Sequence, residues 1–136
     1  MSIELQGLDS LLDSLENIAD PQKLNLALGR ACALVERSAK QKAPKDTGEL
    51  RRSISSKVQD GVGIVFTPLE YAPYVEYGTG LFAESGGRTD VPWSYQDDSG
   101  EWHSTSGQKP QPFMRPALDE NREQIIRIIK EGITEE

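Results

Sequence analysis

The sequence is poor in the residues that most active sites and metal sites use. It has one cysteine, Cys32, and one histidine, His103. A single cysteine excludes an internal disulfide and a multi-cysteine metal site, and a zinc or iron centre needs several such ligands. A Gly-x-Ser-x-Gly elbow and a phosphate-binding loop with its lysine are also missing. We therefore expect no enzymatic activity, no cofactor, no metal and no small-molecule substrate.

Long apolar runs are absent as well. No stretch approaches the roughly 18 apolar residues of a membrane-spanning helix, and no basic, apolar leader opens the chain. We expect no membrane contact and synthesis in the cytoplasm. Apolar residues make up 36% of the 136 residues, below the roughly 45–50% of typical globular domains. The core is therefore modest, and we expect neighbouring proteins to cover some of the apolar surface.

The charges are unevenly distributed along a chain of net charge −7. Residues 37–57 carry seven basic and two acidic side chains, whereas residues 60–103 carry eight acidic side chains and one basic one, Arg88. This division allows the basic side of one copy to face the acidic side of the next, as in a head-to-tail ring. Two solvated faces of a soluble protein explain the division equally well.

Apolar periodicity predicts two helices in the first third of the chain. Residues 8–18 place leucines and Ile18 on one stripe. Asp20 and Pro21 are typical of a helix start and predict a longer helix over 21–43. Its predicted inner face is rich in alanine and packs on a sheet, with Cys32 as a core residue rather than a nucleophile. The predicted face comprises Leu24, Ala27, Leu28, Ala31, Cys32, Val35 and Ala39.

The stretch from Ala43 to Ile54 is interpreted as a hinge between helix and sheet. Pro44 lacks an amide hydrogen and ends the preceding helix. Asp46 and Glu49 have the spacing of a capping box for a new turn that includes Gly48. We assign Pro44, Asp46 and Gly48 to fold support. Three basic residues crowd onto this hinge: Lys45, Arg51 and Arg52.

Two strands are predicted over 52–67, joined at Asp60-Gly61, a dipeptide typical of a hairpin turn. The tyrosines that follow, Tyr71, Tyr74 and Tyr77, either pack on the sheet edge or form a contact surface, because tyrosine is favoured at interfaces.

Residues 78–111 are too long for an ordinary loop and predict a functional excursion. Residues 91–96 and 101–105 alternate around Asp97-Asp98-Ser99-Gly100, which predicts a hairpin arm. Trp93, Tyr95 and Trp102 would crowd onto this arm. Either they meet a partner or the two tryptophans pack on each other to hold the hairpin.

The end of the chain predicts one more helix, over 115–132, with an isoleucine-rich apolar side. Phe113 and Pro116 are assigned to fold support at its start. Together these elements predict a single α+β domain over 1–136. A small antiparallel sheet is packed by a long N-terminal helix and a C-terminal helix, and a β-hairpin arm projects from it.

Three separated motifs resemble the signature of a family of small structural proteins of long-tailed bacteriophages, the neck, tail-completion or tail-component proteins. They are APKDTGELRRSI at 43–54, YAPYVEYGTG at 71–80 and QPFMRPAL at 111–118. The resemblance implies a virion protein, of a phage or prophage, that forms a hexameric or twelvefold ring at the head–tail junction. The ring would join the head connector and head-closure proteins to the tail-terminator or tail-tube proteins and leave a channel for genomic DNA.

Two alternatives stay open. A tail-terminator ring of the same particle would use similar contacts, with the tail tube as neighbour. A small nucleic-acid-binding module is the alternative from another class, because several basic side chains could follow phosphates. These are Lys40, Lys42, Lys45, Arg51, Arg52 and Lys57. Our predicted assembly residues are Arg51, Arg52, Tyr71, Tyr74, Tyr77, Trp93, Tyr95 and Trp102.

Overall fold

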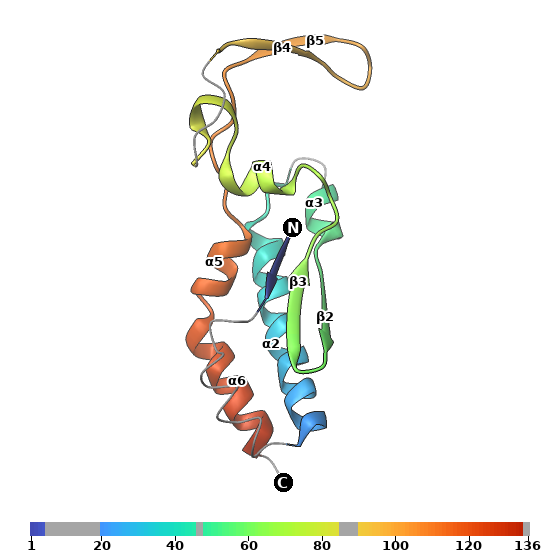
Figure 1. The fold of residues 1–136 in the computed structure, drawn as a ribbon, viewed down its shortest axis with the longest axis vertical. Helices are drawn as coiled ribbons and strands as arrows, with labels where there is room; N and C mark the ends of the chain where they lie inside the picture. The colour runs from blue at the N-terminus through green and yellow to red at the C-terminus, as the bar shows by residue number, and fades with distance from the viewer. Residues whose placement is uncertain (5–19, 46–47, 85–89, 135–136) are drawn as a thin grey trace. The chain divides into compact units, whose positions relative to one another are not determined.

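The computed structural model describes residues 1–4, 20–45, 48–84 and 90–134. The chain divides into two compact units, one made of Met1–Leu69 and Phe113–Glu136, the other of Glu70–Pro112. We call them the helical unit and the hairpin unit (Figure 1). The single domain over 1–136 stays a prediction, and the helix predicted over 8–18 lies outside the described residues.

The helical unit is built around α2, Pro21–Lys42. The helix begins where the sequence indicates, because the Asp20 side chain accepts a hydrogen bond from the Gln22 amide at 2.9 Å and Pro21 occupies the first turn. It ends at Ala43, which is extended directly before Pro44. The predicted inner face is confirmed, since all seven of its residues are buried, and Ser38 joins them.

Cys32 lies in this core, as predicted. Burial, with a smaller contribution from Glu36, raises the pKa of its thiol from 9.0 to about 11. The thiol is therefore protonated at neutral pH, and only a thiolate would be nucleophilic.

A three-stranded antiparallel sheet packs on α2, with strand order β1-β3-β2. β2 is Ser55–Gln59 and β3 is Val62–Phe66, paired from Ser55 opposite Phe66 to Gln59 opposite Val62. The two-residue turn between them has positive φ at Asp60 (51°) and Gly61 (79°), as a type I′ turn requires. The predicted hairpin is confirmed, but residues 52 and 53, which were predicted to begin its first strand, are helical. β1, Ser2–Glu4, was not predicted, because three residues are too few to show an alternating pattern.

The C-terminal part forms two helices rather than the single predicted one. α5 spans Met114–Asp119 and α6 spans Arg122–Thr134. The Asn121 side chain donates to the Ala117 carbonyl at 2.7 Å, so a side chain takes the acceptor that a continuous helix would use for a backbone amide. The Asn121 amide bonds the Leu118 carbonyl instead, at 3.3 Å. The predicted continuous helix over 115–132 is therefore wrong at residues 120–121.

In the helical unit, the buried face of α2 packs against the sheet and against α5 and α6, and α5 also contacts β1 (Figure 1). α5 contributes Met114 and Ala117 to the core, and α6 contributes Ile125 and Ile129. At Gly132 of α6 the helices approach so closely that an added Cβ would lie 2.7 Å from the Cβ of Ala27. The α+β class, with a long N-terminal helix packed by a C-terminal helix, is confirmed.

The two helical glycines of this unit give a matched test of that close approach. We expect Gly132→Ala to lower the free energy of unfolding by about 1–3 kcal/mol, since the new methyl group overpacks the contact with Ala27. Gly29→Ala should raise it by roughly 0.5–1 kcal/mol, because a Cβ there meets nothing within 4 Å and only the helix-propensity gain remains. Urea unfolding of the two variants checks both signs, and equal shifts would contradict the packing of α6 on α2.

Candidate assembly surface

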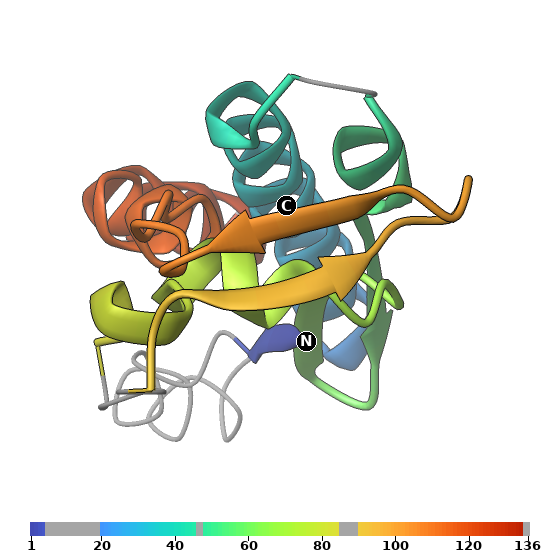
Figure 2. The same cartoon turned by 90° about the horizontal axis from the view of Figure 1, so that it is seen from above.

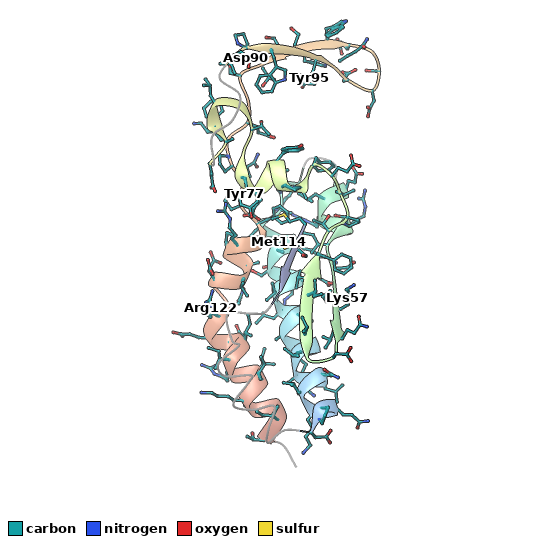
Figure 3. The ribbon with its side chains drawn as sticks, in the orientation of Figure 1. Lys57, Tyr77, Asp90, Tyr95, Met114 and Arg122 are labelled. Carbon is teal, nitrogen blue, oxygen red and sulfur yellow. The ribbon has the colours of Figure 1, made fainter. Side chains whose placement is uncertain are left out.

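The hairpin unit begins with α4, Ala72–Tyr77, which displays a stripe of tyrosines. Tyr71, Tyr74 and Tyr77 follow one another at intervals of three residues and therefore share one side of the helix. All three are exposed, Tyr74 by 59%. Figure 3 labels Tyr77 at the end of this helix. Gly78 then turns the chain with φ of 82°, and its amide bonds the Tyr74 carbonyl at 2.9 Å.

Backbone pairing closes the base of the excursion that follows. The Thr79 amide donates to the Gln108 carbonyl at 2.9 Å, and the Gln108 amide donates back at 3.2 Å. The Leu81 amide extends this pairing to the Ser106 carbonyl at 3.0 Å. Gly80 and Gly107 both have positive φ, and a Cβ on Gly107 would collide with the Thr79 carbonyl. The two chain segments therefore approach more closely than side chains would permit.

The predicted hairpin is formed by β4, Trp93–Gln96, and β5, Trp102–Thr105, which lie side by side and antiparallel in Figure 2. Gln96 pairs with Trp102, not with Glu101 as the predicted four-residue loop requires. Gly100 has φ of 85°, and the Gly100 amide bonds the Asp97 carbonyl at 3.0 Å. This geometry is typical of a three-residue loop that ends in a left-handed residue.

This one-residue difference between the predicted and the observed strand register places the two tryptophans on opposite faces of the hairpin. Residues that pair directly share a face of the sheet, so Trp93 and Tyr95 lie on one face with Thr105 and His103, whereas Trp102 lies on the other. All three aromatic residues lie on the arm, as expected, but Trp102 faces the other side, so the two tryptophans do not hold the hairpin by packing on each other.

The two tryptophans also differ in their surroundings. Trp93 is half-buried, and its Cη2 atom would lie 2.8 Å from a Cβ placed on Gly80. It therefore packs against the base of the hairpin. Trp102 is 68% exposed. Tyr95, labelled in Figure 3, is exposed too, and its ring stacks on the His103 ring with centroids 5.4 Å apart.

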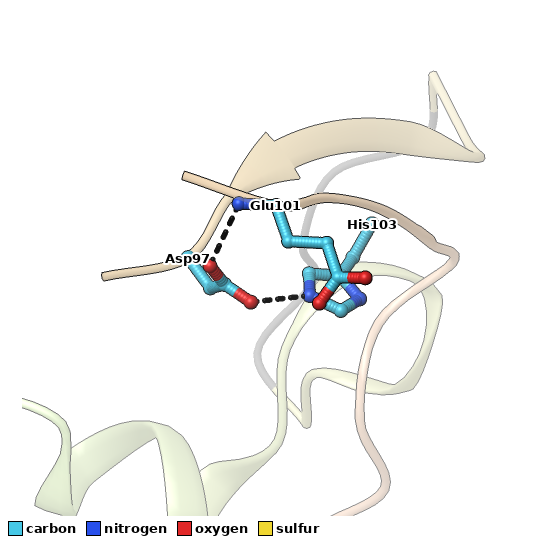
Figure 4. A group of neighbouring side chains, drawn as sticks. All are labelled: Asp97, Glu101 and His103. Atoms are coloured by element: carbon cyan, nitrogen blue, oxygen red, sulfur yellow. Dashed lines mark hydrogen bonds and ion pairs between the residues drawn. The ribbon is translucent and has the colours of Figure 1, made fainter. Parts of the chain in front are cut away.

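A cluster of Asp97, Glu101 and His103 anchors the hairpin turn (Figure 4). The Asp97 Oδ1 atom accepts from the Ser99 amide at 3.0 Å, the Ser99 hydroxyl at 2.8 Å and the Glu101 amide at 2.9 Å. Its Oδ2 atom contacts His103 Nε2 at 2.7 Å. A cation would have to displace His103 from Asp97, so we interpret the cluster as a turn support. The sequence prediction missed it because the three residues converge only in the observed register.

The hairpin unit has almost no core of its own. Among its described residues, Ala72 is the one apolar side chain that is fully buried. Of the nine large apolar side chains that are exposed in the described part of the chain, seven belong to this unit. Units of this size rarely bury enough surface to be stable alone, and exposed apolar patches mark interaction sites. The seven are Tyr71, Tyr74, Tyr77, Leu81, Phe82, Tyr95 and Trp102.

The six basic side chains that could follow phosphates lie in and around the hinge in the helical unit, and the three outside the hinge itself are engaged within the chain. Lys42 lies 2.7 Å from Glu120 and Lys40 lies 3.7 Å from Glu36. The Lys57 ammonium lies over the Phe66 ring, 5.6 Å from its centroid (Lys57 is labelled in Figure 3). Three of the six cations available to phosphates are thus already paired, which weakens the nucleic-acid alternative.

The arginines of the hinge are carried by α3, Glu49–Ser53. The helix starts directly after Gly48, so Glu49 is its first residue and the predicted capping box is wrong in register; Asp46 lies outside the described residues. Gly48 has φ of 74°, and a Cβ there would lie 2.9 Å from Arg52 Nη1. Arg52 is exposed, whereas Nε and Nη2 of Arg51 are buried without a hydrogen-bond partner among the described residues.

The residues assigned to fold support occupy positions that suit that role. Phe113 is fully buried and directly precedes α5, and Pro116 lies in the first turn of α5, where a missing amide hydrogen costs nothing. Pro44 follows the end of α2. Their contribution to stability stays a prediction.

One family model matches residues 8–78, a little over half of the chain, and its description reads "Bacteriophage HK97-gp10, putative tail-component". The chain belongs to this family. The match includes α2, α3, the β2–β3 hairpin and the tyrosines of α4, and it ends before the β4–β5 hairpin. Searches of curated proteins and of solved structures give no significant match.

Membership supports a structural role in the phage tail and a location in the virion. In the part of the chain that the structure describes, no helix has the length and apolar character needed to cross a membrane.

The ionised Asp97 carboxylate should make the stability of the hairpin depend on pH in the acid range. The bond to His103, followed by those to Ser99 and Glu101, lowers the pKa of Asp97 from 3.8 to about 2. Folding therefore favours the ionised carboxylate, and this stabilisation is fully present above pH 3.8 and is lost as the pH falls through about 2. We expect the amide resonances of Ser99 and Glu101 to keep their neutral-pH positions down to pH 3.8 and to change together near pH 2.

A pair of variants isolates the role of that carboxylate. Asp97→Ala should abolish the amide resonances that are typical of the folded hairpin at neutral pH, because four hydrogen-bonding groups lose their partner. Asp98→Ala, at the adjacent exposed position, should leave them unchanged. Equal effects of the two substitutions would refute the turn-support interpretation.

Proposed function

We propose that this tail component forms a hexameric or twelvefold ring at the head–tail junction, joins the head connector and head-closure proteins to the tail, and leaves a channel for DNA. The hairpin unit gives the main support, because its described residues expose seven large apolar side chains and form almost no apolar core. Such a surface gains stability when a partner covers it, and subunits of a ring offer this partner in fixed copy number.

The charges support the same proposal. The hairpin unit has seven acidic residues and two basic ones, Arg88 and Lys109. The hinge in the helical unit keeps exposed cations at Lys45 and Arg52. Opposite charges on two surfaces of one chain favour contact between unlike surfaces of neighbouring copies.

Electron microscopy of lysates tests the position in the particle. When the reading frame is stopped in a phage or prophage that carries it, we expect filled heads beside separate tails of normal length. Tails of uncontrolled length would instead identify a tail terminator. Intact infectious virions would overturn the structural role.

Substitution of each tryptophan distinguishes a role in assembly from a role in folding of the hairpin unit. Trp102→Ala should leave a folded protein that joins heads to tails poorly, because an exposed aromatic anchor at an interface contributes about 2 kcal/mol or more. Trp93→Ala should instead disturb the hairpin itself, since its ring packs at Gly80.

Amide spectra report the fold of both variants, and mixing them with heads and tails from the stopped lysate reports joining. Normal joining by Trp102→Ala would remove Trp102 from the proposed interface. Unchanged hairpin resonances in Trp93→Ala would assign Trp93 to the partner contact instead.

A further inference from the structure

The outer face of α2 combines an exposed leucine with unpaired arginines. Leu26, Arg30, Ala33 and Arg37 are all exposed, Leu26 by 68%. Their spacing of four, three and four residues places them in one stripe along the helix. Neither guanidinium has a partner within the described part of the chain. This side of α2 is opposite to the face that the core buries.

A single exposed leucine is ordinary in a soluble protein, but Leu26 has two arginines beside it on the same stripe. The stripe carries two arginines and no acidic residue. Arginine and tyrosine are enriched at the centres of protein interfaces, because a guanidinium stacks on an aromatic ring and both side chains bury apolar area. The α2 stripe is therefore suited to a surface that supplies tyrosines together with negative charge.

The start of α4 provides such a surface on the same chain. Glu70 is exposed and precedes the tyrosine stripe, and Tyr74, four residues later, is exposed by 59%. Asp98 and Glu101, both exposed, add to the negative field of the hairpin unit. The two surfaces are complementary in charge and in side-chain type, and each exists once per chain.

We propose that the outer face of α2 binds the Glu70–Tyr77 segment of a second copy of this chain. The inference rests on the proposed ring and specifies its subunit contact. Tyrosine rings would cover Leu26 and Ala33, while Glu70 and the acidic hairpin unit face Arg30 and Arg37. Because the two surfaces differ, the contact is heterologous: every copy in the interior of an assembly uses both, and the series ends only by closing into a ring.

Two variants, each lacking one surface, test the pairing by complementation. Arg30→Glu with Arg37→Glu removes the α2 surface and keeps the tyrosines. Glu70→Lys with Tyr74→Ala removes the tyrosine surface and keeps α2. All four side chains are exposed, so circular dichroism should report an unchanged fold in both variants. Arg127→Glu with Lys130→Glu, exposed on α6, is the control with the same net charge as the first variant.

Light scattering after size-exclusion chromatography gives the mass of each protein and of the mixture. We expect the wild type and the α6 control to assemble into multi-copy species that dissociate at high salt, because exposed charges are screened. Each double variant alone should be monomeric. Mixed in equal amounts, they should form a one-to-one dimer and nothing larger, since one intact surface remains on each partner.

Any one of three results would overturn the inference. The first is that the α2 variant assembles like the wild type, and the second is that the mixture stays monomeric although both variants are folded. The third is that the wild type itself is a monomer at the highest soluble concentration. Normal association of the α2 variant together with loss of salt-sensitive DNA binding would assign the arginines to nucleic acid instead. The lysate experiment is independent of these outcomes: separate normal-length tails would keep the junction role even when this subunit contact fails.

Discussion

The burial of α2 on two sides is the constraint on which the rest of the helical unit depends. One side of the helix meets the sheet and another meets α5 and α6. Alanine makes this double contact feasible, because Ala27, Ala31 and Ala39 allow close approach where larger side chains would separate the layers. Gly132 shows how little space remains, since a single methyl group would collide with Ala27. What α2 leaves uncovered is the opposite side, with Leu26, Arg30 and Arg37.

The local chemistry of the sequence predicted α2 closely because its boundaries do not depend on tertiary contacts. Asp20 and Pro21 start the helix and Pro44 stops it, each through its own backbone requirement. The β2–β3 turn is similar, because Asp60-Gly61 can adopt the two positive φ angles that the turn needs. In both cases the residues that determine the element lie inside it or within two residues of its ends.

Two incorrect predictions, the continuous C-terminal helix and the hairpin register, depend instead on individual side-chain and backbone interactions that the apolar pattern does not show. The helix break at Asn121 depends on one side-chain bond to the Ala117 carbonyl, which competes with an otherwise continuous apolar pattern. The hairpin register depends on the Asp97 carboxylate and on Gly100, which shorten the loop by one residue and move Trp102 to the other face. A strand pattern with period two reverses its faces after any one-residue error. The sequence thus indicated that aromatic residues gather on this hairpin, but it did not reveal which of them face outward.

Residues that stabilise the hairpin unit differ from those that it exposes. Trp93 and the glycines at positions 80 and 107 stabilise the base of the excursion, and Asp97 stabilises its tip. Local hydrogen bonds and one half-buried ring therefore replace the apolar core that a unit of this size cannot build. Because so little apolar surface is used internally, Tyr74, Tyr95 and Trp102 stay available for contact with another protein. Under the proposed function this division is useful, because the helical unit has a core of its own, whereas the exposed apolar side chains of the hairpin unit would gain stability from a partner that covers them.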